Sequence, residues 1–491
     1  MTASQVDEVR LYGGWRRTRG MGLWGLSAGA TVVVLGCVLV PLLLAAVSTR
    51  LGLQATLPAA VLALLTLMRI RGVPLGDVVV RRGRWTIGTL TGRRHLRAGA
   101  LAPLEDGLRV PAPLAHLELI RAEDGRGGHF GLVHDTRTGT FAATLRCAAS
   151  STWLVDGREA DGWVSNWHSW LASLGYSPAV RWVNVTVDSA PEPGTTLRDE
   201  IDNRLDPAAP ADVQALMSEL VRCSPAAAAH VETRVSITFD PAAMTARLPE
   251  LHDRAAEVSR LLTGFESQLG SCGVTVLGRA RAQDLAAVVR TAYDPSARGD
   301  VERALRSARP VDWQDAGPVA TQETWDHYQH DSGVSVTWGW HEAPRQQVTS
   351  DVLTRLLSPG RYPRRVSLLY RPLSAGAAAR VLESQVNAAA FRDAYRRAQK
   401  RDETARDAAD REQAQRAAHE EAAGAGVVLI SLYVTVTAGD TDELAEAVAD
   451  IESRADQCKV QVRRLYAGQA VGFATTLPLG VCPTHLRQGR L

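Results

Sequence analysis

Few residues in this sequence have the type and spacing that catalysis requires. Asp440-Thr441-Asp442 has the Asp-x-Asp spacing with which metal-dependent glycosyltransferases hold a metal ion bound to a nucleotide-sugar. The same residues stand directly before a predicted helix, where carboxylates accept hydrogen bonds from the first backbone N–H groups and face the positive end of the helix dipole. We interpret them as a helix cap, and a membrane-bound, glycosyltransferase-like enzyme is the alternative that rests on them.

A second candidate is a metal site. His327, His330 and Asp331 lie close together, with His341 nearby, and histidines three residues apart can share one face of a helix. On a strand, side chains three apart point to opposite faces, and no cysteine thiolate joins these histidines. We therefore predict a polar hairpin here and no bound metal.

The chain lacks the motif with which many ATPases bind nucleotide. Lys400 and Lys459 are its only lysines, and neither follows glycine or precedes Ser or Thr, as the lysine of a P-loop must. No nucleophile or zinc motif of the G-x-S-x-G or H-E-x-x-H type occurs, and the six cysteines form no C-x-x-C pair. The sequence predicts a protein that is not an enzyme and that holds no cofactor.

Two apolar runs near the N-terminus predict a membrane anchor. Residues 21–47 contain no Asp, Glu, Lys or Arg, and a second run extends from Leu51 to Met68. A helix needs roughly 20 apolar residues to cross the hydrocarbon core, so residues 21–68 are predicted to form a transmembrane helical hairpin. A cleaved signal peptide is the alternative, because Ala45-Ala46-Val47 resembles a processing site. The run is too long for that reading, and a second run follows at once.

Arginine positions predict the orientation of this hairpin in the inner, or plasma, membrane. Arginines flank both spans on their outer ends, whereas the turn between the spans carries only Arg50. Because cytoplasmic flanks collect Lys and Arg, we expect both termini and the main body in the cytoplasm, with residues 1–20 as a cytoplasmic segment. Residues 69–110 are predicted as a basic juxtamembrane linker, either solvated or lying at the interface. The side chains expected at the membrane interface are Trp15, Arg16, Arg17, Arg81, Arg82, Arg84 and Trp85.

The charge balance argues against a general nucleic-acid binder. The 491 residues include 55 Lys and Arg against 53 Asp and Glu, for a net charge of +2. A nucleic-acid-binding domain would be strongly basic, so we expect no direct contact with nucleic acid.

Past the membrane, alternating patterns predict an α+β body. Predicted strands have apolar residues at every second position, and predicted helices have them at every third or fourth. Short loops separate these elements, which favours a two-layer sandwich of sheet and helices in two halves, 111–310 and 311–491. The strands are expected at 130–134, 140–147, 183–187, 231–239, 334–340, 365–370, 427–437 and 460–466, and the helices at 159–174, 254–269, 283–293, 350–357 and 442–455.

The second half adds two candidate contact surfaces. A long helix is predicted from Ala375 toward Ala423. Its part at 391–423 is so rich in Arg, Asp and Glu that we expect a solvated charged arm, one that can pair with another helix. Four aromatic residues fit the core of a hairpin, although they could also form a binding face for a partner. These four are Trp325, Tyr328, Trp338 and Trp340.

Several short motifs resemble those of a known family. They include Tyr12-Gly-Gly-Trp15-Arg-Arg17 before the first span, Ala292-Tyr-Asp-Pro295, Asp315-Ala-Gly-Pro318 and Trp325-x-x-Tyr328-x-His330-Asp-Ser-Gly333. With them the chain resembles, nearly from end to end, a family of actinobacterial integral membrane proteins from conjugation or type IV secretion-like gene clusters. The architecture is similar to a PrgI-like two-span membrane subunit fused to the N-terminal, non-motor domain of conjugative ATPases of the CagE/TrbE/VirB type.

The resemblance implies a non-enzymatic inner-membrane scaffold of a machine that transfers DNA or protein. Since the P-loop domain is missing, ATP hydrolysis would come from a separate TraC/VirB-type ATPase docked at the membrane. A PrgI-like membrane protein would be a further partner, within an oligomeric secretion complex. A type VII secretion membrane subunit, which can also combine two spans with a cytosolic α/β domain, is the alternative within this broad class.

Overall fold

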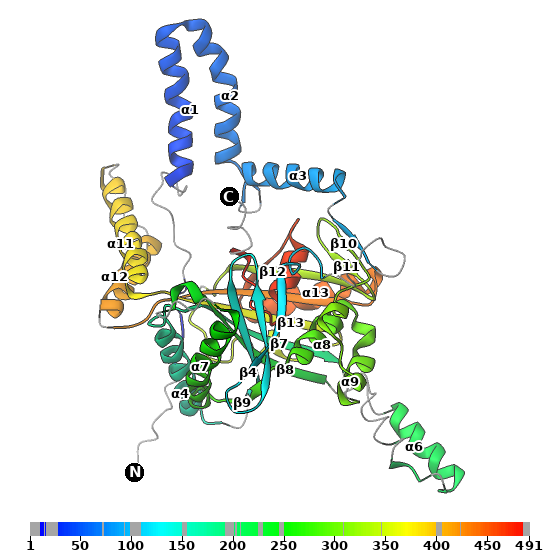
Figure 1. The fold of residues 1–491 in the computed structure, drawn as a ribbon. Coiled ribbons are helices and arrows are strands. Elements are labelled where there is room, and N and C mark those ends of the chain that lie inside the picture. The colour runs from blue at the N-terminus through cyan, green and yellow to red at the C-terminus, as the bar shows by residue number, and fades with distance from the viewer. Residues whose placement is uncertain are drawn as a thin grey trace, which may run out of the picture. The chain divides into compact units, whose positions relative to one another are not determined.

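The computed structural model of the chain is drawn in Figure 1. It describes residues 10–13, 15, 28–70, 73–92, 94–98, 110–149, 155–191, 201, 204–206, 208–223, 229–244, 250–307, 309–344, 346–398, 405–422 and 424–484. The chain divides into two compact units. One, which we call the body, comprises Met1–Gly13, Arg94–Ser374 and Gly426–Leu491, and the other, the helical unit, comprises Gly14–Arg93 and Ala375–Ala425. Helices and a large antiparallel sheet confirm the α+β class.

Two apolar helices open the helical unit. α1 (Ala28–Val47) and α2 (Thr49–Leu67) form a hairpin. They approach most closely near its turn, where Gly52 is buried and a Cβ built on it would lie 2.5 Å from the Cβ of Ala45. Elsewhere their large apolar side chains are exposed, and only 6% of each span is buried. Both helices are long and apolar enough to cross a membrane.

The segment predicted as a linker contains a third helix. β1 (Arg69–Ile70) and β2 (Val73–Pro74) pair in a tight turn, and α3 (Leu75–Leu90) follows directly. The Leu75 N–H donates to the Met68 carbonyl at 2.7 Å, which ties the start of α3 to the end of α2. Glycines and arginines interrupt the apolar pattern of this segment, which is why periodicity alone does not predict the helix.

The predicted charged arm is a pair of helices. α11 (Ala375–Ala398) and α12 (Ala405–Ala422) pack against each other within the helical unit. Small residues such as Ala414 are buried in this unit, and Arg411 Nη1 lies 3.6 Å from Asp393 Oδ2 across the pair. The single long helix expected from the sequence is therefore interrupted, and its charged half folds back on the first.

The body is built on a sheet of 13 strands. Eleven lie in the order β3-β10-β11-β12-β14-β13-β7-β8-β6-β5-β4, while β15 pairs with β12 and β9 pairs with β6. All of these pairs are antiparallel. The strands are β3 (His95–Arg97), β4 (Leu117–Glu123), β5 (His129–Asp135), β6 (Thr140–Ala149), β7 (Val180–Pro191), β8 (Ala229–Phe239), β9 (Val274–Arg279), β10 (Ala320–Glu323), β11 (Tyr328–His330), β12 (Gly333–Glu342), β13 (Arg364–Pro372), β14 (Val428–Ala438) and β15 (Gln461–Arg464).

The two halves expected from the sequence share this one sheet. β13, from the second half, lies between β14 of the same half and β7 of the first. Val366 pairs with Val187 and Leu368 with Val185 across that junction. Hydrogen bonding thus continues from one half into the other, and residue 310 marks no structural boundary.

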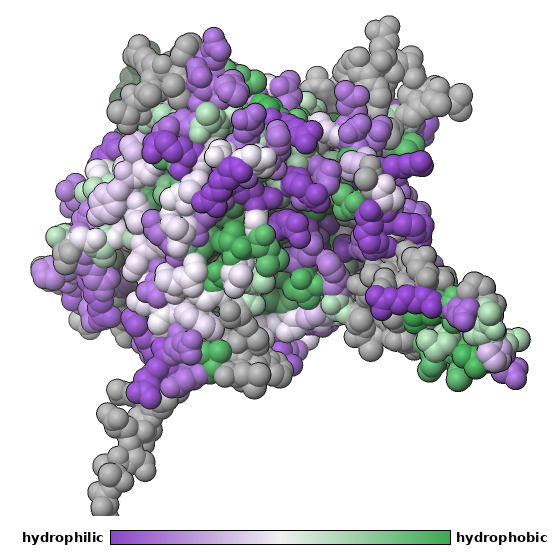
Figure 2. Space-filling model, turned by 60° about the horizontal axis from the view of Figure 1, so that its bottom comes forward, coloured by the Kyte–Doolittle hydropathy of each residue, from purple (hydrophilic) through white to green (hydrophobic). Residues whose placement is uncertain are grey.

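Helices cover both faces of the sheet, whereas a two-layer sandwich would have them on one. Leu132 of β5 packs in a core with α4 and α7, and the next residue, Val133, packs in a second core with α8 and α14. Successive strand residues point to opposite faces, so these cores lie on opposite sides. The α-helices described in the body are α4 (Gly157–Leu174), α6 (Ala211–Cys223), α7 (Leu251–Leu269), α8 (Ala282–Tyr293), α9 (Arg298–Arg306), α10 (Thr354–Leu357), α13 (Thr441–Gln457) and α14 (Gln469–Thr475), and α6 contributes no described residue to these cores. On the side seen in Figure 2, hydrophilic residues surround a smaller apolar area, unlike the apolar exterior of α1 and α2.

The face that bears α14 carries buried hydroxyl groups in the middle of the sheet. Thr144 Oγ1 lies 2.8 Å from Ser236 Oγ, and Thr337 Oγ1 lies 2.8 Å from Thr435 Oγ1. All four residues are at most 1% exposed. Since a buried hydroxyl without a partner costs free energy, these cross-strand hydrogen bonds are a condition for closing the core.

The C-terminal segment 469–482, which we call the strap, covers this polar face. Thr144 Oγ1 donates to the carbonyl of Pro478 at 2.9 Å, and Trp182 Nε1 donates to that of Gly480 at 3.0 Å. Thr435 Oγ1 lies 2.9 Å from Thr476 Oγ1. The strap therefore supplies backbone acceptors to side chains of β6 and β7 and a hydroxyl partner to a side chain of β14, a role that no local pattern in its sequence predicts.

Gly480 lies close against the sheet, and substituting it tests the contact between strap and sheet. Its φ is +70°, and a Cβ there would collide with Ala142 and Thr238 of the sheet. We expect Gly480→Ala to lower the free energy of unfolding by about 1 kcal/mol for the left-handed backbone and about 2 kcal/mol more for the collision. Thermal unfolding of the full chain in detergent, followed by tryptophan fluorescence, measures the loss.

Gly139 provides the matched control for this substitution. Its φ is +72°, yet nothing lies within 4 Å of a Cβ built there. Gly139→Ala should therefore show only the backbone cost, about 1 kcal/mol. Equal losses for the two variants would contradict a close contact between strap and sheet.

Candidate functional site

The Asp-x-Asp sequence is a helix cap, as predicted. Asp440 precedes α13, and its Oδ1 accepts hydrogen bonds from the backbone N–H groups of Asp442 and Glu443, both at 2.9 Å. This carboxylate is committed to the first turn of the helix. Among the residues that the structure describes, no group of three or more His, Cys, Asp or Glu side chains is placed to hold a metal ion.

The aromatic residues do not form one exposed face. Trp338 is 1% exposed and belongs to the core beneath α13, while Tyr328 is 2% exposed and belongs to the core beneath α8 and α14. Both rings are enclosed by other residues of the body, as the hairpin-core alternative expects. Trp325, which stacks on Tyr466 at a centroid distance of 6.1 Å, and Trp340 are partly exposed.

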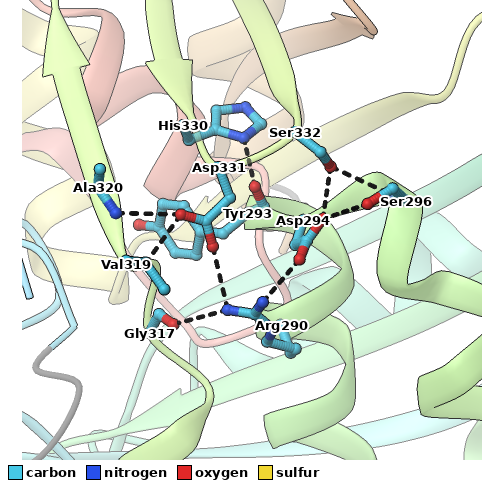
Figure 3. A network of polar contacts seen from close by, with 10 residues as sticks. All are labelled: Arg290, Tyr293, Asp294, Ser296, Gly317, Val319, Ala320, His330, Asp331 and Ser332. Carbon is cyan, nitrogen blue, oxygen red and sulfur yellow. Dashed lines mark hydrogen bonds and ion pairs between the residues drawn. The ribbon is translucent and has the colours of Figure 1, made fainter. Parts of the chain in front are cut away.

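An extended network of polar contacts in the body surrounds Arg290 of α8 (Figure 3). Arg290 Nη2 donates to Asp294 Oδ2 at 2.6 Å, one helical turn along the chain. Its Nη1 donates to Asp331 Oδ2 at 3.0 Å and to the Gly317 carbonyl at 3.1 Å. The other oxygen of Asp331 accepts the backbone N–H groups of Val319 and Ala320 at 2.8 and 3.0 Å. We call this set the arginine junction; it joins α8, the approach to β10 and the β11–β12 turn.

Asp294 is the second hub of the junction. Its Oδ1 accepts hydrogen bonds from the hydroxyls of Ser332 and Ser296, and the Ser296 N–H donates to Ser332 Oγ at 3.1 Å. Burial alone would raise the pKa of Asp294, but the hydrogen bonds from the two serines and the charge of Arg290 together lower it. The carboxylate is therefore held ionised as an acceptor and is not poised to exchange a proton.

His330 closes the junction on its buried side and remains neutral. It is 3% exposed; its Nδ1 lies 2.6 Å from the Tyr293 carbonyl and its Nε2 lies 2.8 Å from Ser335 Oγ. A carbonyl can only accept, so Nδ1 carries the proton and Nε2 accepts from the serine. Burial, only partly offset by the hydrogen bond to Tyr293, lowers the pKa of His330 to about 4. The ring is thus a core side chain with both nitrogens in use.

Gly333 completes this arrangement by leaving room for it. A Cβ on Gly333 would lie 2.8 Å from His330 Cε1 and 2.9 Å from Thr437 Cγ2. The run Asp331-Ser332-Gly333 therefore provides, in order, an acceptor for Arg290, a donor to Asp294 and a residue without a side chain. The motif segments around 292–295, 315–318 and 330–333 meet at the arginine junction, so their residues have a structural role there.

The polar groups of the junction are used within the body. Arg290, Asp294, Asp331 and both nitrogens of His330 are all engaged with neighbours in the body. Sequence reasoning missed Arg290, and the only signal that could have found it is its spacing of four from Asp294 on a predicted helix.

A separate contact attaches the N-terminal segment to the body. Tyr12 forms an isolated antiparallel bridge with Val348, with N–H to O distances of 2.7 and 2.8 Å, and its hydroxyl donates to Asp161 Oδ1 at 2.7 Å. Burial, the hydrogen bond and the charge of Asp161 raise the pKa of Tyr12 to about 12. After the apolar helices, β3 rejoins the body by pairing with β10. The chain thus leaves the body after Gly13 and re-enters it at Arg94.

The expected interface residues lie mainly on α3. Val79, Val80, Ile87 and Leu90 are 50%, 54%, 59% and 87% exposed. At 3.6 residues per turn these four fall within an arc of roughly 100°, and the arginines fall on the remaining surface. That division is typical of helices that lie in the plane of a membrane surface. Arg82 and Arg84 are exposed, Arg81 and Trp85 are half-buried, Trp15 is 37% exposed, and Arg16 and Arg17 lie outside the described residues.

The chain was compared with models of known protein families and with curated proteins. It matches no family model and no curated protein.

Breaking the arginine junction should destabilise the body. Arg290→Met removes the guanidinium that lies between Asp294 and Asp331, whose side chains are 15% and 9% exposed. Two enclosed carboxylates would then face each other without a cation, and we expect the free energy of unfolding to fall by about 3 kcal/mol. Thermal or urea unfolding of the full chain in detergent measures this loss.

The control is Arg260→Met on α7. Arg260 pairs with Glu257 three residues earlier, and its side chain is 69% exposed. Surface pairs of this kind contribute little, so the unfolding midpoint should stay close to that of the unmodified chain. If both variants lose the same stability, the arginine junction is no more than a surface ion pair.

Proposed function

We propose that this protein is a membrane-anchored, non-enzymatic scaffold. The observation that carries the proposal is the path of the chain around its apolar helices. Gly13 and Arg94 both belong to the body, and α1 and α2 lie between them in sequence. Two crossings return a chain to the side on which it started, so two spans fit a body that holds both ends of the hairpin.

The proposed side is the cytoplasm. Arg50 is the only cation in the sequence at the turn of the hairpin, whereas Arg69, Arg71 and the arginines of α3 follow α2 in the sequence. Positive residues are retained on the cytoplasmic side during insertion. α3 would lie on the same surface, with its exposed apolar residues among lipid chains and its arginines near lipid phosphates.

The scaffold role is supported by what the polar groups of the body do. The arginine junction holds elements together, and the Asp-x-Asp carboxylate caps a helix. Together with the missing P-loop, this favours action through contact. Following the family resemblance, we propose that the protein positions a separate TraC/VirB-type ATPase at the membrane of a conjugation or type IV secretion-like machine, beside a PrgI-like subunit.

The proposed docking surface is the pair α11 and α12. It connects β13 to β14 in the chain and carries both signs of charge, including the exposed pair Glu412 and Arg416 with a 2.7 Å contact. Phe391 adds an apolar ring that is 49% exposed. Interleaved charges favour partner choice and orientation, and an exposed aromatic ring can supply an anchor.

Topology gives the first test of this proposal. A reporter that is active only outside the cytoplasm should stay silent when fused after Leu491 and become active when inserted at Thr49, in the turn between α1 and α2. The expectation follows from two crossings with arginines on the body side. Activity at Leu491 together with silence at Thr49 would reverse the orientation and exclude a cytoplasmic body.

Removal of the helix pair α11 and α12, from here on called the arm, gives the second test. The Leu373 N–H donates to the Val427 carbonyl at 2.9 Å, so the two ends of the arm are adjacent. Residues 375–425 can therefore be replaced by a short Gly-Ser linker without opening the sheet. We expect this variant to stay in the membrane with an unchanged unfolding midpoint of the body and to lose capture of the ATPase encoded beside it.

The control for the arm deletion removes charged side chains from a different place, helix α7 of the body. Replacing Glu257 and Arg260 of α7 with Ala removes an exposed ion pair of the body, and this variant should capture the ATPase as the unmodified chain does. Capture is measured by pull-down from detergent extract at low salt. A cognate ATPase that fails to accompany the unmodified chain would refute docking, while membrane anchoring would stand on the reporter result.

A further inference from the structure

A group of arginines is buried on the polar face of the sheet, apart from the arginine junction. Arg234 of β8, Arg365 of β13 and Arg298, the first residue of α9, surround Asp188 of β7. The register explains why they meet, because Arg365 is paired with Asp188 while Arg234 is paired with Thr186 on the same strand. Directly paired residues point to the same face of a sheet, so these side chains gather in one place.

Positive charge is in excess at this place. Asp188 Oδ2 lies 3.9 Å from Arg234 Nη1 and 4.0 Å from Arg298 Nη2, both longer than a hydrogen bond. Glu232, whose side chain is 35% exposed, contacts Arg234 from the solvent edge. Three guanidinium groups thus share two carboxylates. Burial, reinforced by the charges of Arg298 and Arg146 and opposed by those of Asp188 and Asp284, lowers the pKa of Arg234 to about 10.

Several N–H groups of these arginines lack acceptors. Arg365 Nε and Nη2 and Arg234 Nη1 are buried and form no hydrogen bond with any part of the chain that the structure describes. Arg365 is only 5% exposed, and its guanidinium carbon lies 4.7 Å from the centre of the Phe473 ring. The ring packs against the guanidinium but accepts no hydrogen bond from its N–H groups. Buried donors almost always have a partner, and an exception indicates a water molecule or an ion.

An anion satisfies this site better than water does. Water would accept the N–H groups but leave the excess charge buried, which is costly in a low-dielectric interior. A tetrahedral oxyanion supplies several acceptors and the missing negative charge together, and the planar fork of arginine matches its oxygens. Arg234 and Asp188 are only 7% and 8% exposed, so an ion held between these side chains would be largely shielded from solvent.

We propose that Arg234, Arg298 and Arg365 form a binding site for a small tetrahedral oxyanion, of which inorganic phosphate and sulfate are the chemical models. The site rests on the body alone and does not depend on the scaffold role. Because its arginines come from two central strands and a covering helix, a bound oxyanion would stabilise the folded body.

The test compares inorganic phosphate with chloride. The full chain is purified in detergent without phosphate or sulfate, and thermal unfolding is followed while sodium phosphate replaces sodium chloride at constant ionic strength. We expect a saturable rise of several degrees in the unfolding midpoint within the low millimolar range, since ligand binding to the folded state alone stabilises it. Equilibrium dialysis with radioactive phosphate should give one phosphate per chain. A midpoint equal to that in chloride, or a rise that never saturates, would overturn the proposal.

Variants assign the effect to this site. Arg365→Gln and Arg298→Gln should each abolish bound phosphate and the rise in midpoint. Arg361→Gln, close to Arg365 in sequence but 66% exposed and paired with Glu446, should retain both. Arg298 lies at the rim, with a side chain 16% exposed, so its variant decides the question if Arg365→Gln does not fold. Phosphate binding that persists in Arg298→Gln would place the anion elsewhere and refute the assignment.

Discussion

A sheet face lined with hydroxyl groups can be buried only when the chain itself supplies their partners. In this protein Thr144, Ser236 and Thr435 meet that condition through neighbouring strands and through the strap. An apolar covering would remove the partners that the strap supplies to Thr144 and Thr435. The order of the sheet, the path of residues 469–482 and the absence of a side chain at Gly480 all follow from this single requirement.

Much of the body could be predicted from local patterns. Alternation at Val231–Phe239 and Val427–Thr437 gives strands because each has one face against helices, and the spacing of Trp170, Leu171 and Leu174 gives α4 because that face is buried. The cap at Asp440 could also be predicted, since a carboxylate before a helix has a local role. Such features depend only on residues within one turn or one strand.

Other features could not be predicted, because their causes lie far apart in the sequence. Arg290 joins α8 to a turn 41 residues later, and the buried arginines meet only when β13 is placed beside β7. Tyr328 and Trp338 are both aromatic residues of the same predicted hairpin, yet their side chains belong to cores on different faces of the sheet. The second layer of helices was missed for the same reason, since a strand pattern does not say what covers its polar side.

The segments on either side of the apolar hairpin pair with strands and loops made much later, and this sets the order of events during synthesis. Tyr12 pairs with Val348, and β3 pairs with β10, so neither attachment can form until most of the chain has left the ribosome. The apolar helices are complete within the first 67 residues. Insertion into a membrane would therefore precede closure of the body, and the nascent sheet would assemble while already tethered to the bilayer. The strap, made last, then seals the polar face.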